Sequence, residues 1–159
     1  MKIIFKKYLT INNMKSSKEK IISLLKNFFN EKDEILAVYV FGSFVDKEKY
    51  HDIDIAVLIK NDFNFYDTKK FPFGYESEIN AKLIKLTRIK IDFVVLNKLP
   101  ILFQKNIFKK NIIIIDRDKQ GRINYETKIK KLFVDVEYIM KIKNIYLNRK
   151  LNNARLNIN

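Results

Sequence analysis

Two segments with the composition of buried strands stand only ten residues apart, and this spacing limits how they can pair. The first is EILAVYVF (34–41) and the second is DIDIAVLI (52–59), and both are rich in β-branched or aromatic residues. The connecting segment, GSFVDKEKYH, is too short for the helical crossover that parallel neighbours need. We therefore expect the two strands to be antiparallel neighbours or to be joined by one helical turn.

The rest of the chain predicts an α+β (α/β) fold, a small mixed sheet of about four strands flanked by helices. Apolar residues at helical spacing predict a first helix that ends near Asn30. Strand-like and helix-like patterns then alternate along the chain. The further expected elements are a long loop over 61–77, a helix over 76–86, a strand over 90–97, a helix over 100–109, a strand over 111–116, a turn over 117–122 and a long helix from Asn124.

The length and the large apolar share favour a single domain over residues 1–159. We expect residues 1–15 to form a short strand or a loose extension, and residues 150–159 to be a frayed tail.

An apolar stripe on the last helix is expected to be core, and any part left exposed becomes a candidate docking face. The stripe consists of Tyr125, Ile129, Leu132, Phe133, Val136, Ile139 and Met140.

Two carboxylates open the second strand. Side chains alternate between the faces of a strand, so Asp52 and Asp54 point the same way, opposite to Ile53 and Ile55. Neighbouring carboxylates repel each other, and a divalent cation such as Mg²⁺ relieves the repulsion. Asp92 opens a later strand and completes a three-carboxylate site if that strand lies beside the second one. Such a site suits two-metal phosphoryl or nucleotidyl transfer, with Asp92 as metal ligand and proton acceptor.

The Gly-Ser pair that follows the first strand supplies groups that bind phosphate. Gly42 lets the backbone approach a phosphate closely, and Ser43 offers a hydroxyl and an amide N–H. Lys47 and Lys49 follow in the same loop, where an ammonium group could neutralise triphosphate charge. Tyr66 and Tyr75 are expected beside the cleft, where ordinary packing is favoured over stacking on an adenine.

Composition excludes several classes of protein. The absence of cysteine rules out a disulfide framework and a thiolate metal site. No apolar run reaches the roughly 20 residues that span a bilayer. The start of the chain is basic, but Lys6 and Lys7 interrupt its apolar stretch. This pattern is not typical of a secretory signal. We therefore expect a cytoplasmic protein without a membrane partner.

The net charge of +14 raises the question of a polyanionic partner. Lysines outnumber arginines by 27 to 5, whereas a surface for nucleic acid would favour Arg, which grips phosphate in two places. Compositional drift therefore explains the charge better than a nucleic-acid surface. Direct RNA binding ranks last among the hypotheses.

The order strand, Gly-Ser, short loop, Asp-x-Asp, apolar strand and later strand-borne Asp resembles the nucleotidyltransferase superfamily related to polymerase beta and kanamycin nucleotidyltransferase. Within it, the chain looks most like the minimal nucleotidyltransferases (MNT). The likeness covers roughly residues 17–145 and includes KIDFVVLNKLPILFQKNIFKKNIIIIDRD and the closing helix with YETKIKKLFVDVEYI. The MNT group is best known as the antitoxin half of HEPN–MNT toxin–antitoxin pairs.

The resemblance implies a nucleotidyltransferase fold and a Mg²⁺-dependent transfer of AMP from ATP to a tyrosine of a cognate HEPN ribonuclease toxin. Gly42 and Ser43 would hold the nucleotide phosphates. Asp52 and Asp54 would bind magnesium, two ions being expected. Asp92 would complete the metal site and act as the base.

Two alternatives stay open. A non-catalytic antitoxin that neutralises its toxin by binding is motivated by the loop: only eight residues separate Ser43 from Asp52, and Phe44-Val45-Asp46 replaces the Arg and Gly often found there. The second alternative is transfer to a small molecule such as an aminoglycoside. It ranks lower because the chain is short for a substrate domain of its own.

Overall fold

The computed structural model describes the backbone of residues 17–156 and the side chains of 17–150. The expected N-terminal extension over 1–15 lies outside the described residues. The elements are a first helix over 17–30, β1 (Ile35–Phe41), α2 (Ser43–Asp46), β2 (Asp52–Ile59), α3 (Tyr75–Thr87), β3 (Lys90–Val95), a 3₁₀ turn (Leu96–Lys98), α4 (Ile101–Lys109), β4 (Asn111–Asp116) and α5 (Lys119–Leu156).

The four strands form one mixed sheet in the order β3-β2-β1-β4. β1 is antiparallel to both β2 and β4, whereas β2 and β3 are parallel and are connected through α3. The predicted α+β fold class, a mixed sheet of four strands with flanking helices, is confirmed. The two arrangements expected for the short connection occur together: β1 and β2 are antiparallel neighbours, and the single helical turn α2 joins them.

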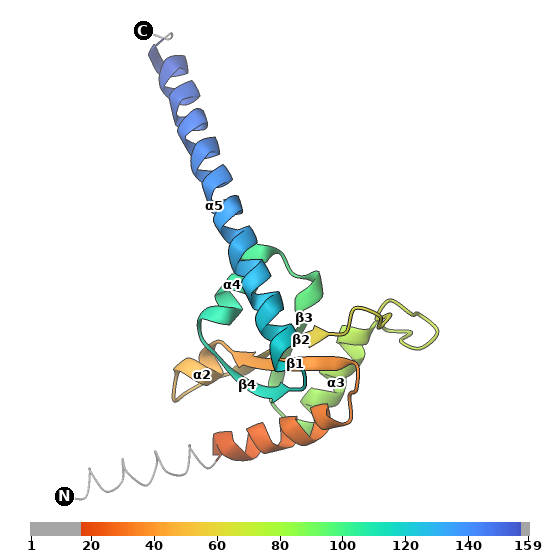
Figure 1. Ribbon diagram of the computed structural model, residues 1–159. Helices are drawn as coiled ribbons and strands as arrows, with labels where there is room; N and C mark the ends of the chain where they lie inside the picture. Colours follow the sequence, from red (N-terminus) through yellow and green to blue (C-terminus); the bar gives the residue numbers. More distant parts are fainter. Residues whose placement is uncertain (1–16, 157–159) are drawn as a thin grey trace, which may run out of the picture.

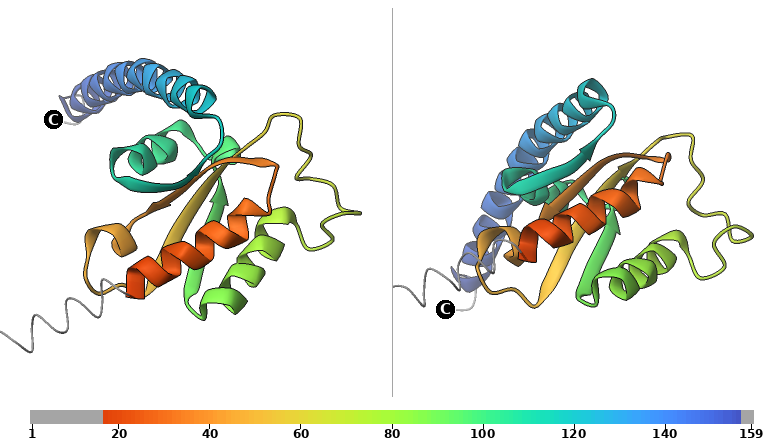
Figure 2. Two further views of the ribbon diagram at one scale, coloured as in Figure 1. Left: turned by 60° about the horizontal axis from the view of Figure 1, so that its bottom comes forward. Right: turned by 90° about the horizontal axis from the view of Figure 1, so that it is seen from below.

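Helices cover both faces of the sheet (Figures 1 and 2). On one face the first helix and α3 bury a large apolar core, which includes Leu25, Phe29, Ile53 and Leu83. On the other face α4 and the first turns of α5 cover a smaller cluster around Tyr39. Since successive side chains of β2 alternate between these clusters, its even-numbered residues face α4 and α5.

Four boundaries differ from the prediction. The segment over 117–122 is not a turn, because α5 already begins at Lys119. The carboxylate of Asp118 accepts the backbone N–H of Gly121 at 2.8 Å and so starts the helix. β3 ends at Val95 and does not continue to residue 97. The side-chain amide of Asn97 accepts a hydrogen bond from the backbone N–H of Ile59 and donates one to its C=O, both at 3.0 Å. The loop after β2 ends at Gly74, and residues 150–156 continue as helix.

A buried ion network fixes the start of α5 on the sheet. Arg122, only 8% exposed, donates two hydrogen bonds to Asp116 at 3.0 and 2.9 Å and one to Glu126 at 2.7 Å. Glu126 also accepts the hydroxyl proton of Tyr39 at 2.9 Å. Burial and the neighbouring Glu126 carboxylate raise the pKa of Tyr39 above its ordinary value, so the phenol stays a donor. No helix in the described part of the chain is long and apolar enough to cross a membrane.

Replacing Arg122 by Met should destabilise the fold by about 3 kcal/mol, because it leaves Asp116 and Glu126 without their buried partner. Chemical denaturation measures this loss. The matched change Lys130→Met removes an exposed ammonium 3.8 Å from Glu126 and should alter the stability by less than about 0.5 kcal/mol. Equal losses in the two variants would contradict the structural role given to Arg122.

Candidate active site

The first residues of β2 and β3 place three carboxylates on one face of the sheet. Asp52 and Asp54 are half-buried, while the intervening Ile53 is buried in the main core. In the parallel pairing of β2 with β3, Asp92 stands directly opposite Asp54. Asp92 is therefore neither on the far face nor covered, and its side chain is 49% exposed. The structure brings the three predicted aspartates to the same end of the sheet.

Gly42 lies directly against Asp54. Its backbone has φ +69° and ψ −150°, a conformation that residues with a side chain rarely adopt. A Cβ atom at this position would stand 2.0 Å from Oδ2 of Asp54. Glycine is thus required here for two reasons: the chain turns sharply out of β1, and the carboxylate occupies the space of a side chain.

Ser43, the first residue of α2, contacts the other carboxylate of the pair. Its hydroxyl donates to Oδ1 of Asp52 at 3.3 Å, which ties the Gly-Ser turn to the start of β2. Gly42 and Ser43 therefore lie beside the aspartates, as predicted. Their role in binding phosphate stays a prediction.

Lys90 is a site residue that the sequence analysis missed. It stands opposite Asp52 in the register, and its ammonium nitrogen lies 3.1 Å from Oδ2 of Asp92 and 3.6 Å from Oδ2 of Asp52. The lysine thus shares one positive charge between two carboxylates. The signal was present in the sequence: Lys90 and Asp92 are two residues apart on one strand and so share a face.

The crowding of negative charge is visible in the ionisation of Asp54. Burial raises the pKa of Asp54 above its ordinary value, and the neighbouring charges of Asp52 and Asp92 raise it further. Lys90 acts in the opposite direction and lowers it. The cluster therefore favours either a proton on Asp54 or an additional cation.

The donor set fits a hard divalent cation, although the three carboxylates do not converge on a single point. Among the side chains described, those of residues 17–150, no three acidic or histidine groups stand close enough together to hold an ion. Three carboxylates on adjacent strands nevertheless offer the oxygen ligands that Mg²⁺ prefers. The ammonium of Lys90 stands between two of them, at the kind of position that a cation would take.

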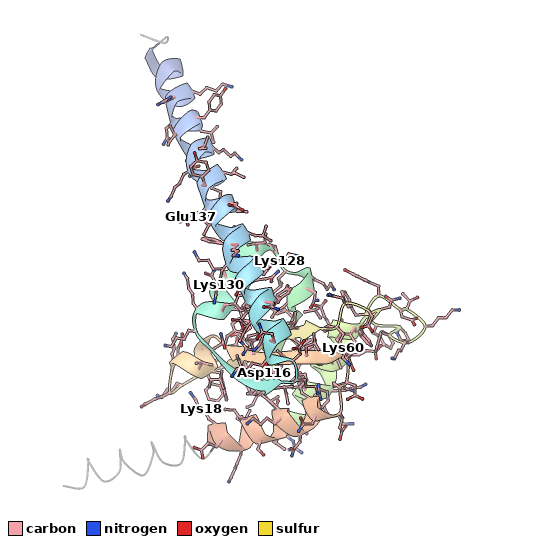
Figure 3. The ribbon with its side chains drawn as sticks, viewed as in Figure 1. Lys18, Lys60, Asp116, Lys128, Lys130 and Glu137 are labelled. Carbon is pink, nitrogen blue, oxygen red and sulfur yellow. The ribbon has the colours of Figure 1, made fainter. Side chains whose placement is uncertain are left out.

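Lys18 of the first helix holds the Gly-Ser turn from outside (Figure 3). Its ammonium donates to the carbonyls of Phe44 and Lys47, both at 2.6 Å, and lies over the Phe44 and Tyr50 rings. Phe44 itself is buried in the main core. Phe44 thus anchors α2 to the domain.

The aromatic residues of the long loop do not belong to this site. Figure 1 shows α2 and the loop after β2 at opposite ends of the sheet. Tyr66 and Tyr75 are therefore not beside the aspartates, and the expectation that they flank the cleft is wrong. Tyr75 is buried, and its hydroxyl donates to Glu34 at 2.9 Å, which agrees with ordinary packing.

Residues 19–120 match the protein family described as polymerase beta, nucleotidyltransferase. No curated protein matches the sequence.

Three solved structures share the fold. The matching chain of a tri-AMPylated Shewanella oneidensis HEPN toxin in complex with MNT antitoxin is 20% identical, covers 78% of this chain and 89% of its own length, and has a TM-score of 0.56. The matching chain of the toxin–antitoxin MntA–HepT is 19% identical, covers 77% of this chain and 89% of its own length, and has a TM-score of 0.55. The matching chain of a toxin–antitoxin with AMP-PNP is 20% identical, covers 76% of this chain and 89% of its own length, and has a TM-score of 0.58.

The variant Gly42→Ala should lose about 3 kcal/mol of stability or displace Asp54, because the new methyl group clashes with its carboxylate and strains the backbone. Denaturant unfolding measures the loss. Gly74→Ala is the matched control, since Gly74 has φ +85° but no atom within 4 Å of an added Cβ. In an Asp54→Ala background, the stability that Gly42→Ala removes should shrink to the amount that Gly74→Ala removes. A stability loss of unchanged size would contradict the clash between the new methyl group and the Asp54 carboxylate.

Without metal, Asp54→Asn should stabilise the protein at neutral pH by on the order of 0.5 kcal/mol, because it removes one of the clustered charges. Because folding raises the pKa of Asp54, its ionisation opposes folding increasingly as the pH rises above the ordinary value, and this effect is complete above the raised pKa. The gain should therefore disappear as the pH falls below the ordinary value of 3.8. Thermal unfolding in EDTA between pH 3 and pH 8, with Asp135→Asn on α5 as control, measures it. A gain that does not depend on pH would contradict the charge clustering.

Proposed function

Since this chain belongs to the polymerase beta nucleotidyltransferase family, we propose that it is a Mg²⁺-dependent protein adenylyltransferase. It transfers AMP from ATP to a tyrosine of a cognate HEPN-type ribonuclease toxin and so acts as the antitoxin. The observation that carries the proposal is the gathering of Asp52, Asp54 and Asp92 on one face of the sheet, against Gly42. The likeness to toxin–antitoxin structures, one with a tri-AMPylated toxin and one with AMP-PNP, supports the choice of donor and acceptor.

Each site residue has a chemical task in this reaction. Gly42 and Ser43 bind the triphosphate, because the sharp turn at the glycine brings the backbone beside the aspartates and the serine offers donors. Asp52, Asp54 and Asp92 would hold the magnesium, for which we expect two ions, and the metal would neutralise the charge that develops on the phosphates. Lys90, which lies between Asp52 and Asp92, would then have to move aside and would be a free cation at the rim of the site.

The transfer itself exchanges one P–O bond for another. The tyrosine hydroxyl oxygen attacks the α-phosphorus of ATP, and the bond from that phosphorus to the bridging oxygen of the β-phosphate breaks. Pyrophosphate leaves, and the hydroxyl proton passes to the carboxylate of Asp92, which is exposed enough to meet a substrate. We expect this reaction in the cytoplasm, because both of its substrates, ATP and the ribonuclease toxin, occur there.

A non-catalytic antitoxin is the second candidate. Lys90 favours it, because the lysine shares its positive charge between Asp52 and Asp92 and so offsets part of their repulsion without a metal. In that case the carboxylates would serve the fold and the complex, and the toxin would be silenced by occlusion alone. Neutralisation in cells by an Asp52→Asn plus Asp54→Asn variant would favour this candidate.

Incubation with ATP labelled at the α-phosphate and the HEPN protein encoded beside this chain should label the toxin. Asp52→Asn plus Asp54→Asn, and separately Asp92→Asn, should reduce the rate at least about 100-fold, because they remove metal ligands and the base. EDTA should stop the reaction and added Mg²⁺ should restore it. Asp62→Asn, in the loop at the opposite end of β2, serves as control and should retain the rate. No label from the wild type, or undiminished label from the aspartate variants, would overturn the proposal.

A further inference from the structure

The last helix extends well beyond the domain that it closes. α5 runs from Lys119 to Leu156, and its first turns pack on α4 and the sheet. Tyr125 donates to Gln104 of α4 at 2.8 Å, and Ile129 is buried. Lys105 of α4 also lies over the ring of Phe133. Beyond Phe133 the helix extends away from the labelled elements of the domain (Figures 1 and 3). The expectation that its apolar stripe is core is therefore wrong for the exposed residues Leu132, Ile139 and Met140, while Phe133 and Val136 are half-buried.

The projecting part is rich in exposed apolar side chains. Tyr138 is 65% exposed, Ile142 49% and Ile145 54%. We call the exposed apolar residues of this segment the α5 surface. It consists of Leu132, Val134, Tyr138, Ile139, Met140, Ile142, Ile145, Tyr146 and Leu147. A continuous apolar surface of this kind on a monomer marks a site of interaction.

The sequence pattern gives the helix only one narrow polar side. Glu137, Lys141, Asn144 and Asn148 follow one another at spacings of four, three and four residues, and so form a single polar stripe. Most of the remaining circumference is apolar. A helix with this pattern is normally buried on most of its sides, so its partner must enclose it in a groove and not merely touch one stripe.

We propose that the α5 surface inserts into an apolar groove with an acidic rim on the HEPN-type toxin, and so holds the protein substrate at the adenylylation site. This inference rests on the proposed function and adds where and how the substrate binds. Helix-in-groove recognition commonly uses apolar anchors at spacings of three and four residues, and Tyr138, Ile142 and Ile145 have this spacing.

Charge argues for an acidic partner. Residues 128–150 hold seven Lys or Arg side chains and two acidic ones, and the chain as a whole carries +14. Two copies of this helix side by side would bring like charges together, whereas an acidic rim would attract them. An anionic membrane fits less well, because Asp135 and Lys143 lie among the apolar positions and not on the polar stripe.

The direction of the helix agrees with a role in substrate delivery. The aspartates lie on the sheet face that α4 and α5 cover. In both Figure 1 and Figure 2, the projecting half of α5 leans toward the end of the sheet that carries α2. A protein bound along this half is therefore held on the same side of the molecule as Asp52, Asp54 and Asp92.

The test compares two triple variants of the full chain. One changes the α5 surface (Tyr138→Gln, Ile142→Gln and Ile145→Gln), and the matched control changes the polar stripe without changing its charge (Lys141→Arg, Asn144→Gln and Asn148→Gln). Titration calorimetry measures the Kd for the purified HEPN protein encoded beside this chain, and steady-state transfer measures the KM values for that protein and for ATP.

The surface variant should weaken the Kd for the toxin at least about tenfold and raise the KM for the toxin, because it removes the central anchors. Its KM for ATP and its melting temperature should stay unchanged, and the control should bind like the wild type. If the toxin binds in this way but receives no AMP, the adenylyltransferase proposal fails while the docking surface stands.

Three results would overturn the inference. The first is a Kd for the toxin that the surface variant leaves unchanged, or no binding by the wild type. The second is a dimer of the wild type alone in sedimentation that the surface variant dissociates, since the α5 surface would then belong to a second copy. The third is flotation of the wild type, but not of the variant, with phosphatidylserine-containing vesicles while toxin binding stays intact.

Discussion

Repulsion among three carboxylates is the constraint on which the rest of the site depends. The pairing of β2 with β3 fixes Asp54 opposite Asp92, and the alternation of side chains along β2 puts Asp52 beside them. A sheet cannot separate these groups without shifting its register, and such a shift would expose the buried isoleucines of β2. The apolar core therefore holds the charges together, and the repulsion between them favours either a proton on Asp54 or an additional cation.

The Gly-Ser turn and the first helix complete this arrangement. Gly42 lets β1 end directly against Asp54, and Ser43 donates to Asp52. Phe44 is buried, so the four residues of α2 are fixed to the core, and Lys18 holds their carbonyl end. The short loop thus has a rigid anchor in Phe44. This anchor explains how eight residues suffice between Ser43 and Asp52.

The sequence predicted the features that depend on local pattern. Alternation along the second strand put Asp52 and Asp54 on one face, and the short connection limited the pairing of β1 with β2. The partner of β2 on its other side depends on a crossover through α3, so the place of Asp92 rested on the family resemblance. Lys90 was missed because its role appears only when two strands are aligned. The expected position of Tyr66 and Tyr75 beside the cleft was wrong, because the aspartates stand at the start of β2 and the loop that leads to these tyrosines follows its end.

The end of α5 shows a different limit of sequence reasoning. Its apolar spacing is the same before and after Ile129, so the pattern alone indicated one continuous core stripe. What ends the burial is the size of the sheet and of α4, which cover only the first turns of the helix. Periodicity predicts which side of a helix is apolar, but the extent of the neighbouring elements decides how much of that side the domain itself can cover.

The most direct test of the central claim is a crystal structure of the chain with Mg²⁺ and AMP-PNP. We expect metal density bound by oxygens of Asp52, Asp54 and Asp92 at about 2.1 Å. We also expect the triphosphate against Gly42 and Ser43, and the Lys90 ammonium displaced from the carboxylates. A nucleotide bound elsewhere, with Lys90 still joining Asp52 to Asp92 and no metal at the aspartates, would contradict it.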